Sequence, residues 1–174
     1  GGGALYGRQD RPLTDPRGDS NLVIREAEGA ADMETVRELF LEYQAAIGVD
    51  LCFQDFDEEL KNLPGRYQRP FGCLLLATDA DQIAAVIGMG PLGEGVAEMK
   101  RLYVRAPWRG TELGRRLADA VVRAARDAGH QRICLDTLEF MTEARALYQS
   151  MGFNEIPAYY DNPLDGVIYM ECAL

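Results

Sequence analysis

Three strand-length hydrophobic segments in a row, followed by one long amphipathic helix, constrain the fold of this chain more than any other feature. The segments span residues 72–78, 82–88 and 96–104, and short polar or glycine-containing turns at 79–81 and 93–95 separate them. Turns this short join neighbouring antiparallel strands. We therefore expect these segments to form consecutive strands of one sheet.

The predicted helix over 111–128 carries apolar residues on one face and ends at Gly129. The remaining periodicities predict a strand at 22–27, a helix that Asp32 caps and that runs to Ile47, a short helix at 56–63, a strand at 133–137, a helix at 142–151, and strands at 153–156 and 167–171. This order predicts an α/β fold with a mixed, largely antiparallel central sheet flanked by about four helices.

The length of 174 residues suits a single domain, which we place at 21–174. Residues 1–20 are rich in Gly, Pro, Asp and Arg without periodicity, and we interpret them as a disordered tail or an artificial extension. Neither a signal peptide nor an apolar run long enough to span a membrane is present. We therefore expect a cytoplasmic protein without a membrane partner.

Charge is distributed unevenly along the chain. Eighteen Lys and Arg against 28 Asp and Glu give a net charge of −10, which argues against nucleic acid as a partner. Between Gly93 and Arg132, however, nine basic residues face five acidic ones, so this segment carries +4 and the rest −14. A basic island in an acidic chain predicts a local site for a polyanion.

The cysteines and the single histidine do not predict a metal site. Cys52, Cys73, Cys134 and Cys172 lack close pairing, and one histidine adds too few ligands for zinc. We expect buried, reduced thiols. His130 follows a helix stop, which predicts an exposed loop rather than a catalytic position.

One glycine motif is expected to be misleading. Gly88, Gly90 and Gly93 fit the pattern G-x-G-x-x-G after an apolar strand, as in dinucleotide-binding sites. Such a site needs a helix to begin there, with its N-terminus facing the pyrophosphate. Here Pro91 and the following glycines lead into another strand, so we predict a hairpin.

A better anion site lies between the strand 96–104 and the helix 111–128. Free N–H groups at the start of that helix, together with its dipole, suit a pyrophosphate. Arg109, Arg115 and Arg116 add positive charge. The alternative is an ordinary strand-to-helix turn with solvated arginines.

Two stretches in this order resemble a known family. Both are similar to motifs of the GCN5-related N-acetyltransferases. The first is the strand 98–104 followed by Pro107–Gly114, and the second is the stretch 144–153, which contains the runs Ala-Arg-Ala-Leu-Tyr and Gly-Phe. The acetyl-CoA signature of that family, Arg/Gln-x-x-Gly-x-Gly/Ala, falls on 109–114. The resemblance covers Leu22 to Leu174 and implies a GNAT-like fold with acetyl-CoA as co-substrate and no metal.

The resemblance implies a set of cofactor-binding residues on the strand 96–104, at the start of the following helix and before the helix 142–151. They are Leu102, Tyr103, Val104, Arg109, Gly110, Thr111, Glu112, Leu113, Gly114, Arg115 and Met141. The backbone of 102–104 would pair with the pantetheine arm as an added strand, and the N–H of Leu102 would polarise the thioester carbonyl. Two positions depart from the family: Glu112 replaces the first Gly of the signature, and Met141 stands where many members carry Asn.

Two residues are candidates for acid–base catalysis. The resemblance implies that Tyr148 protonates the departing thiolate, and the alternative is a core tyrosine. Glu98 is the candidate base that deprotonates the amine, directly or through a water. Strand alternation predicts that Glu98 shares a face with Lys100 and Leu102, and a surface ion pair with Lys100 or Arg101 is the alternative role.

The implied function is direct transfer of an acetyl group from acetyl-CoA to a primary amine, which we expect to belong to a small molecule. A protein N-terminus or lysine as acceptor, and a non-catalytic acyl-CoA sensor, are the alternatives. The aromatic segment 159–163 predicts either part of an acceptor pocket or a hairpin turn. The apolar segment 167–174 could pair with a partner sheet in a homodimer.

Overall fold

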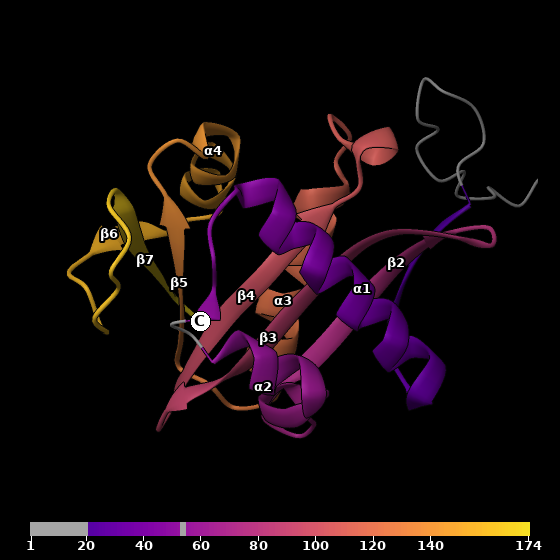
Figure 1. Cartoon of the computed structure of the whole chain (residues 1–174). Coiled ribbons are helices and arrows are strands. Elements are labelled where there is room, and N and C mark those ends of the chain that lie inside the picture. The colour runs from indigo at the N-terminus through magenta and orange to yellow at the C-terminus, as the bar shows by residue number, and fades with distance from the viewer. Residues whose placement is uncertain (1–20, 53–54) are drawn as a thin grey trace, which may run out of the picture.

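The computed structural model describes residues 21–52 and 55–174, so the tail expected at 1–20 lies outside the described residues. The chain forms β1 (Leu22–Glu26), α1 (Gly29–Ile47), α2 (Phe56–Lys61), the short 3₁₀ helix η2 (Gly65–Tyr67), β2 (Cys73–Asp79), β3 (Gln82–Gly93), β4 (Val96–Val104), η3 (Ala106–Trp108), α3 (Leu113–Asp127), β5 (Arg132–Leu138), α4 (Thr142–Ser150), β6 (Asn154–Ile156) and β7 (Val167–Ala173). The order of helices and strands is the one that the sequence predicts (Figure 1).

The strands form one seven-stranded sheet in the order β1-β2-β3-β4-β5-β7-β6. Every neighbouring pair is antiparallel except β4 and β5, which run parallel because α3 carries the chain between them. The sheet is thus mixed and mostly antiparallel, as expected. β7 lies between β5 and β6, so the segment expected to reach a partner sheet is an interior strand and β6 forms that edge.

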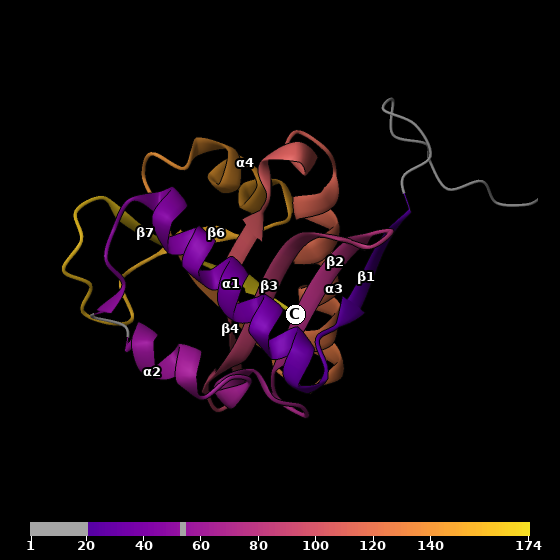
Figure 2. The ribbon, with the colours of Figure 1, turned by 45° about the vertical axis from the view of Figure 1, so that its right-hand side comes forward.

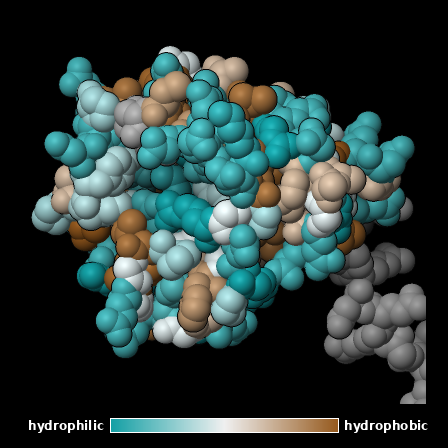
Figure 3. Space-filling model, turned by 60° about the horizontal axis from the view of Figure 1, so that its bottom comes forward, coloured by the Kyte–Doolittle hydropathy of each residue, from teal (hydrophilic) through white to brown (hydrophobic). Residues whose placement is uncertain are grey.

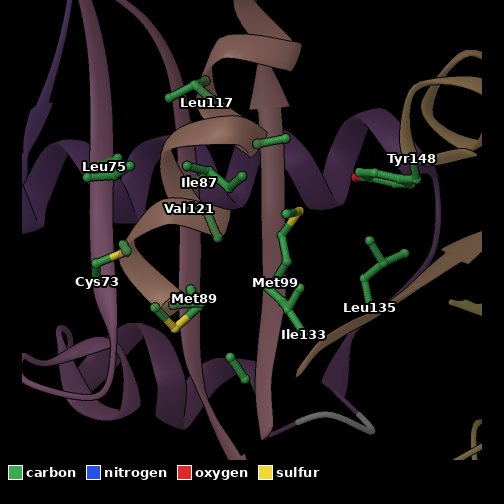
Figure 4. Close-up of a cluster of buried hydrophobic side chains, with 14 of the residues drawn as sticks. Cys73, Leu75, Ile87, Met89, Met99, Leu117, Val121, Ile133, Leu135 and Tyr148 are labelled. Carbon is green, nitrogen blue, oxygen red and sulfur yellow. The ribbon is translucent and has the colours of Figure 1, made fainter. Parts of the chain in front are cut away.

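Helices cover both faces of the sheet (Figure 2). On one face, α1 and α2 pack over a cluster that includes Phe40, Phe56 and Leu76. On the other face, α3 and α4 cover a larger cluster, which Figure 4 shows with Met99, Leu117 and Tyr148 among its members. The sheet therefore has a buried layer on each side, and a side chain from β4 reaches one layer or the other.

Several local expectations differ from the structure. α1 begins at Gly29 rather than after Asp32, but the Asp32 carboxylate still accepts the N–H of Glu28 at 2.8 Å and so satisfies a donor at that end. His130 is buried, with 8% of its surface exposed, and its Nε2 lies 2.9 Å from the carbonyl oxygen of Phe71. The exposed loop expected there was wrong because the chain enters β5 directly beneath the segment before β2.

The glycine motif forms a hairpin, as predicted. β3 continues through Gly88 and Gly90 to Gly93, and β4 begins at Val96. A Cβ atom at Gly88 would lie 2.8 Å from the Tyr67 ring, and one at Gly90 would lie 2.9 Å from the carbonyl oxygen of Arg66. These glycines let η2 approach the sheet closely.

The surface is mostly polar. Figure 3 shows the face that is lowest in Figure 1, where hydrophilic residues predominate and hydrophobic ones are scattered between them. Among the described residues, no helix is long and apolar enough to cross a membrane.

Candidate active site

Two strands at the centre of the sheet separate after a short parallel contact. β4 and β5 pair only from Val96 to Glu98 on one side and from Arg132 to Cys134 on the other. Both strands continue well beyond this contact, to Val104 and Leu138, without further pairing between them. An opening therefore forms in the middle of the sheet, and we call it the split.

A β-bulge in β4 shapes one wall of the split. The pairing of β3 with β4 shifts between Val86 and Gly88, and opposite this shift Arg101 has a φ of 63°. Because two consecutive residues at a bulge face the same side, Leu102 turns to the α3 face, where it packs against the larger cluster. The expectation that Leu102 shares a face with Glu98 and Lys100 was therefore wrong for Leu102. Glu98 and Lys100 do lie together.

Val104 directs its backbone toward the split. It stands opposite Ala85, and the N–H of Arg105 donates to the carbonyl of Ala84 at 2.9 Å, which identifies a non-hydrogen-bonded antiparallel pair. In such a pair the N–H and C=O of the paired residues point away from each other. The Val104 carbonyl accepts Nε of Arg109 at 2.8 Å.

The outer cleft lies between the end of β4, the start of α3 and the start of α4, with a volume of about 540 Å³. Ten of the residues expected to bind the cofactor line it: Leu102, Tyr103, Val104, Arg109, Gly110, Thr111, Glu112, Gly114, Arg115 and Met141. Leu113 does not line it; this side chain is 1% exposed and belongs to the core. Trp108 and Phe140, which the sequence did not single out, add aromatic walls.

The N-terminus of α3 faces the outer cleft with free backbone donors. Its first turn holds no acidic residue; the Thr111 hydroxyl accepts the N–H of Leu113 at 3.3 Å, and the side chain of Glu112, the N-cap residue, accepts none of the first N–H groups. Gly110 has a φ of 74° with nothing within 4 Å of a built Cβ, and at Gly114 the nearest atom is 3.9 Å away on Leu147. The peptide groups here are therefore open to an anion, as a pyrophosphate requires.

The arginines of the basic island have different surroundings in the structure. Arg101, Arg105 and Arg132 form ion pairs with Glu59, Glu42 and Glu171, at 3.1, 2.6 and 3.1 Å. Arg109 and Arg115 line the outer cleft, and Nε of Arg115 lies 3.9 Å from the carboxylate of Asp119. Arg116 is exposed outside it, and Glu112 at its rim is also exposed.

The inner cavity lies beside the outer cleft at the split and has a volume of about 160 Å³. Six residues line both spaces: Tyr43, Ile47, Leu102, Val104, Met141 and Ala144. The cavity passes between Met99 of β4 and Leu135 of β5 and ends near Asp136 and Leu164. The two spaces thus lie next to each other at the split and share part of their walls.

Tyr148 lies in the wall of the inner cavity. The side chain comes from α4, lines the inner cavity and packs against Phe153, with ring centroids 5.8 Å apart. Figure 4 shows its hydroxyl oxygen turned toward β4. Burial raises the pKa of Tyr148, so the hydroxyl keeps its proton at neutral pH.

Glu98 is buried, at 2% exposure, but does not line the inner cavity. Its carboxylate accepts the Tyr159 hydroxyl at 2.6 Å and lies 3.0 Å from Nη1 of Arg66. Nζ of Lys100 is 3.7 Å from the same carboxylate, and Lys100 lines the cavity. Lys100 therefore stands between Glu98 and the cavity, and Arg101, the other expected partner, pairs with Glu59 instead.

The aromatic segment supports carboxylates rather than forming a simple hairpin turn. Burial and the Glu98 carboxylate raise the pKa of Tyr159, and the Tyr160 hydroxyl donates to Asp136 at 2.5 Å. Asn162 donates to the Tyr160 hydroxyl at 2.8 Å and also lines the inner cavity. Asp136 was missed from the sequence; its place two residues beyond Cys134 on β5, next to the split, is visible only once the strands are paired.

The match to known proteins covers most of the chain. The model of the acetyltransferase (GNAT) family matches residues 33–153. An uncharacterized N-acetyltransferase of Schizosaccharomyces pombe is 37% identical over 153 residues, which cover 87% of this chain and 94% of that protein.

Solved structures share the fold. A GNAT-family acetyltransferase of Staphylococcus aureus superposes with a TM-score of 0.72 at 23% identity, covering 87% of this chain and 98% of that one. The acetyltransferase yncA of Salmonella typhimurium, solved with its cofactor acetyl-CoA, superposes with a TM-score of 0.67 at 20% identity, covering 88% and 94%.

Proposed function

The chain belongs to the GNAT acetyltransferase family and is an N-acetyltransferase, and we propose that it transfers the acetyl group of acetyl-CoA directly to the primary amine of a small molecule. The observation that carries the proposal is that the outer cleft and the inner cavity adjoin at the split and share six lining residues. A long cofactor entering from one side and an amine entering from the other would meet between β4 and β5.

The residues of the outer cleft fit acetyl-CoA, which supplies an activated acetyl thioester when bound. The open peptide groups at Gly110 and Gly114, with Arg109 and Arg115 beside them, suit the pyrophosphate. The backbone of Val104 points into the split, where it can pair with the amides of the pantetheine arm. Arg101 and Leu102 lie at the bulge and have no register partner on β3, and the N–H of Leu102 is the donor that would polarise the thioester carbonyl.

We assign Tyr148 as the general acid. The side chain lines the inner cavity, and burial raises the pKa of Tyr148, so the hydroxyl is protonated at neutral pH and can donate to a departing thiolate. Glu98 remains the proposed base, reached from the cavity through a water beside Lys100. Asp136 is the carboxylate that lines the cavity itself.

Two observations support a direct transfer to a small acceptor. None of the described cysteines lines either space, and Cys134 is buried, with a pKa that burial raises to about 11. A volume of about 160 Å³ matches a small amine rather than a folded segment of protein. The cavity also offers a shielded place for the acceptor.

The test combines binding with turnover. Calorimetry of the full chain should detect acetyl-CoA binding, and thiol release should depend on an added primary amine. Initial rates at varied concentrations of both substrates should give intersecting lines, because both must be bound before transfer. Parallel lines, or an acetylated protein in the absence of amine, would overturn the direct transfer. Preferential acetylation of peptide N-termini or lysines would overturn the small-molecule acceptor.

A further inference from the structure

Three charged side chains of the described residues line the inner cavity, and only one of them is fully paired inside the protein. They are Lys100 and Arg101 of β4 and Asp136 of β5. The guanidinium of Arg101 donates to both oxygens of Glu59, at 3.1 and 3.3 Å. Lys100 and Asp136 are left as the charges that a ligand can meet.

Lys100 is a buried cation with a poor internal partner. Its side chain is 9% exposed, and its ion-pair partner, Glu98, is 3.7 Å away. Glu98 already takes shorter contacts from Arg66 at 3.0 Å and from the Tyr159 hydroxyl at 2.6 Å. An ammonium has three N–H donors, so after the contact with Glu98 most of the hydrogen-bonding capacity of Lys100 is still available to a ligand. Burial lowers the pKa of Lys100, which agrees with this incomplete compensation.

Asp136 is held in place by neutral donors. The Tyr160 hydroxyl donates to one of its oxygens at 2.5 Å, and Asn162 fixes that hydroxyl at 2.8 Å. No cation of the described residues forms an ion pair with it, and a carboxylate can accept several more hydrogen bonds. Lys100 and Asp136 themselves form no ion pair, although both line the same cavity on opposite sides of the split.

We infer that the acceptor is a zwitterion of the amino-acid type, whose carboxylate pairs with Lys100 and whose amino group docks at Asp136. Such a ligand satisfies both charges at once, whereas a simple amine leaves Lys100 with only its 3.7 Å contact to Glu98. The apolar walls from Leu51, Leu135 and Leu164 accept an aliphatic side chain. This inference rests on the proposed function and concerns recognition of the acceptor by the same site.

The test uses sets of amines that differ only in the carboxylate. For leucine, the set is leucine, leucinamide and isopentylamine, and parallel sets are prepared for the other natural amino acids. With acetyl-CoA saturating, kcat/KM for the free amino acid should exceed that of its amide and its decarboxylated amine by about 10-fold or more in the best set, the size of one charge-assisted contact. This comparison needs only the unaltered protein.

Two variants then test whether Lys100 is the residue that causes the preference for the free amino acid. Lys100→Met should bring the ratio of amino acid to decarboxylated amine to about one, while Lys61→Met, at an exposed lysine of α2, should keep the ratio of the unaltered protein. A preference for decarboxylated amines, or a ratio that Lys100→Met leaves intact, overturns the zwitterionic acceptor while the proposed function stands. If acetyl-CoA binds but no amine of any set is acetylated, both the inference and the proposed function fail.

Discussion

Glu59 on α2 and Arg101 at the bulge of β4 form a buried ion pair, with side chains 13% and 3% exposed and Nε of the arginine 3.1 Å from the carboxylate. The guanidinium also stacks over Phe56, at 5.0 Å from the ring centroid. Arg101 adopts a left-handed backbone conformation, which costs energy for a residue with a side chain. The ion pair with Glu59 stabilises this backbone conformation. It thereby also fixes the position of the N–H of the next residue, Leu102.

Glu59→Ala should therefore destabilise the protein strongly. It leaves the guanidinium of Arg101 buried without a partner, and loss of one side of a buried pair costs about 3–5 kcal/mol. Glu58→Ala is the matched control, because Glu58 pairs with Lys61 at the surface, where both side chains are more than 60% exposed (66% and 70%). Such a pair is worth about 1 kcal/mol at most. Urea unfolding measures both free energies, and equal losses would contradict the buried role of Glu59.

Tyr148→Phe should lower kcat by at least ~10-fold, because it removes the proposed proton donor. The Kd for acetyl-CoA should stay close to its original value, since the phenyl ring keeps its packing on Phe153. Tyr67→Phe is the control, as Tyr67 is buried to a similar degree but lines neither the outer cleft nor the inner cavity. Steady-state kinetics with calorimetry separates the two quantities, and an unchanged kcat would remove Tyr148 from the mechanism.

Gly114→Ala should separate cofactor binding from stability. The protein itself has room for the methyl group, because Leu147 is 3.9 Å away, and alanine favours a helix over glycine by about 1 kcal/mol. The methyl group would intrude on the space proposed for the pyrophosphate and weaken acetyl-CoA binding by ~10-fold or more, the cost of a modest overlap. The Tm from thermal unfolding should thus rise, while the affinity for acetyl-CoA measured by calorimetry should fall. An unchanged Kd would place the cofactor elsewhere.

Asp32→Asn should lower stability in a pH-dependent way. The Arg25 guanidinium, through its hydrogen bond, and the N–H of Glu28 lower the pKa of Asp32 from 3.8 to about 2. A lowered pKa in the folded state gives stability that is complete above the usual pKa and disappears as the pH falls through about 2. Because Arg25 is 42% exposed, we expect a loss of only about 1 kcal/mol at pH 7. Denaturant unfolding between pH 7 and 2 should show the difference from the original protein shrinking below pH 4; a constant difference would contradict the ion pair.

Gly72→Ala should be far more damaging than Gly93→Ala. A Cβ atom at Gly72 would lie 2.6 Å from the carbonyl oxygen of Arg66 and 2.8 Å from that of Met89, both in backbone that cannot move freely. We expect a loss of about 3 kcal/mol or more, at the upper end of overpacking effects. At Gly93 nothing lies within 4 Å, so alanine should be tolerated. Thermal unfolding of the two variants measures the contrast, and similar Tm values would refute the close packing at Gly72.

The sequence predicted the order of the helices and strands because hydrophobic period and turn residues act over short distances. The strand expected at 96–104 has the same bounds in the structure, and the other boundaries differ by a few residues at most, apart from the extension of β3 to Gly93. The position of His130 could not be predicted in this way, because its burial depends on Phe71, which lies far away in the chain.

The outer cleft was predictable because a single strand–turn–helix unit supplies most of it. Leu113 was the exception, since it turns into the core. The inner cavity was not predictable, because α1, β4, β5, α4 and the segment before β7 each contribute to it. The bulge at Arg101 was not predicted from the sequence either. Strict alternation assigned Leu102 to the wrong face of the sheet, because one extra residue in a strand moves every later side chain to the opposite face.

The short contact between β4 and β5 is the place where the two halves of the sheet are joined. Among residues 21–52 and 55–174, three residue pairs, from Val96 and Arg132 to Glu98 and Cys134, join the two halves of the sheet. Beyond this contact the two strands are unpaired with each other up to their far ends. Next to this contact the N–H of Gln131 donates to the carbonyl of Gly95 at 2.7 Å, so the segment before β5 is tied to the turn before β4 at the closed end of the split.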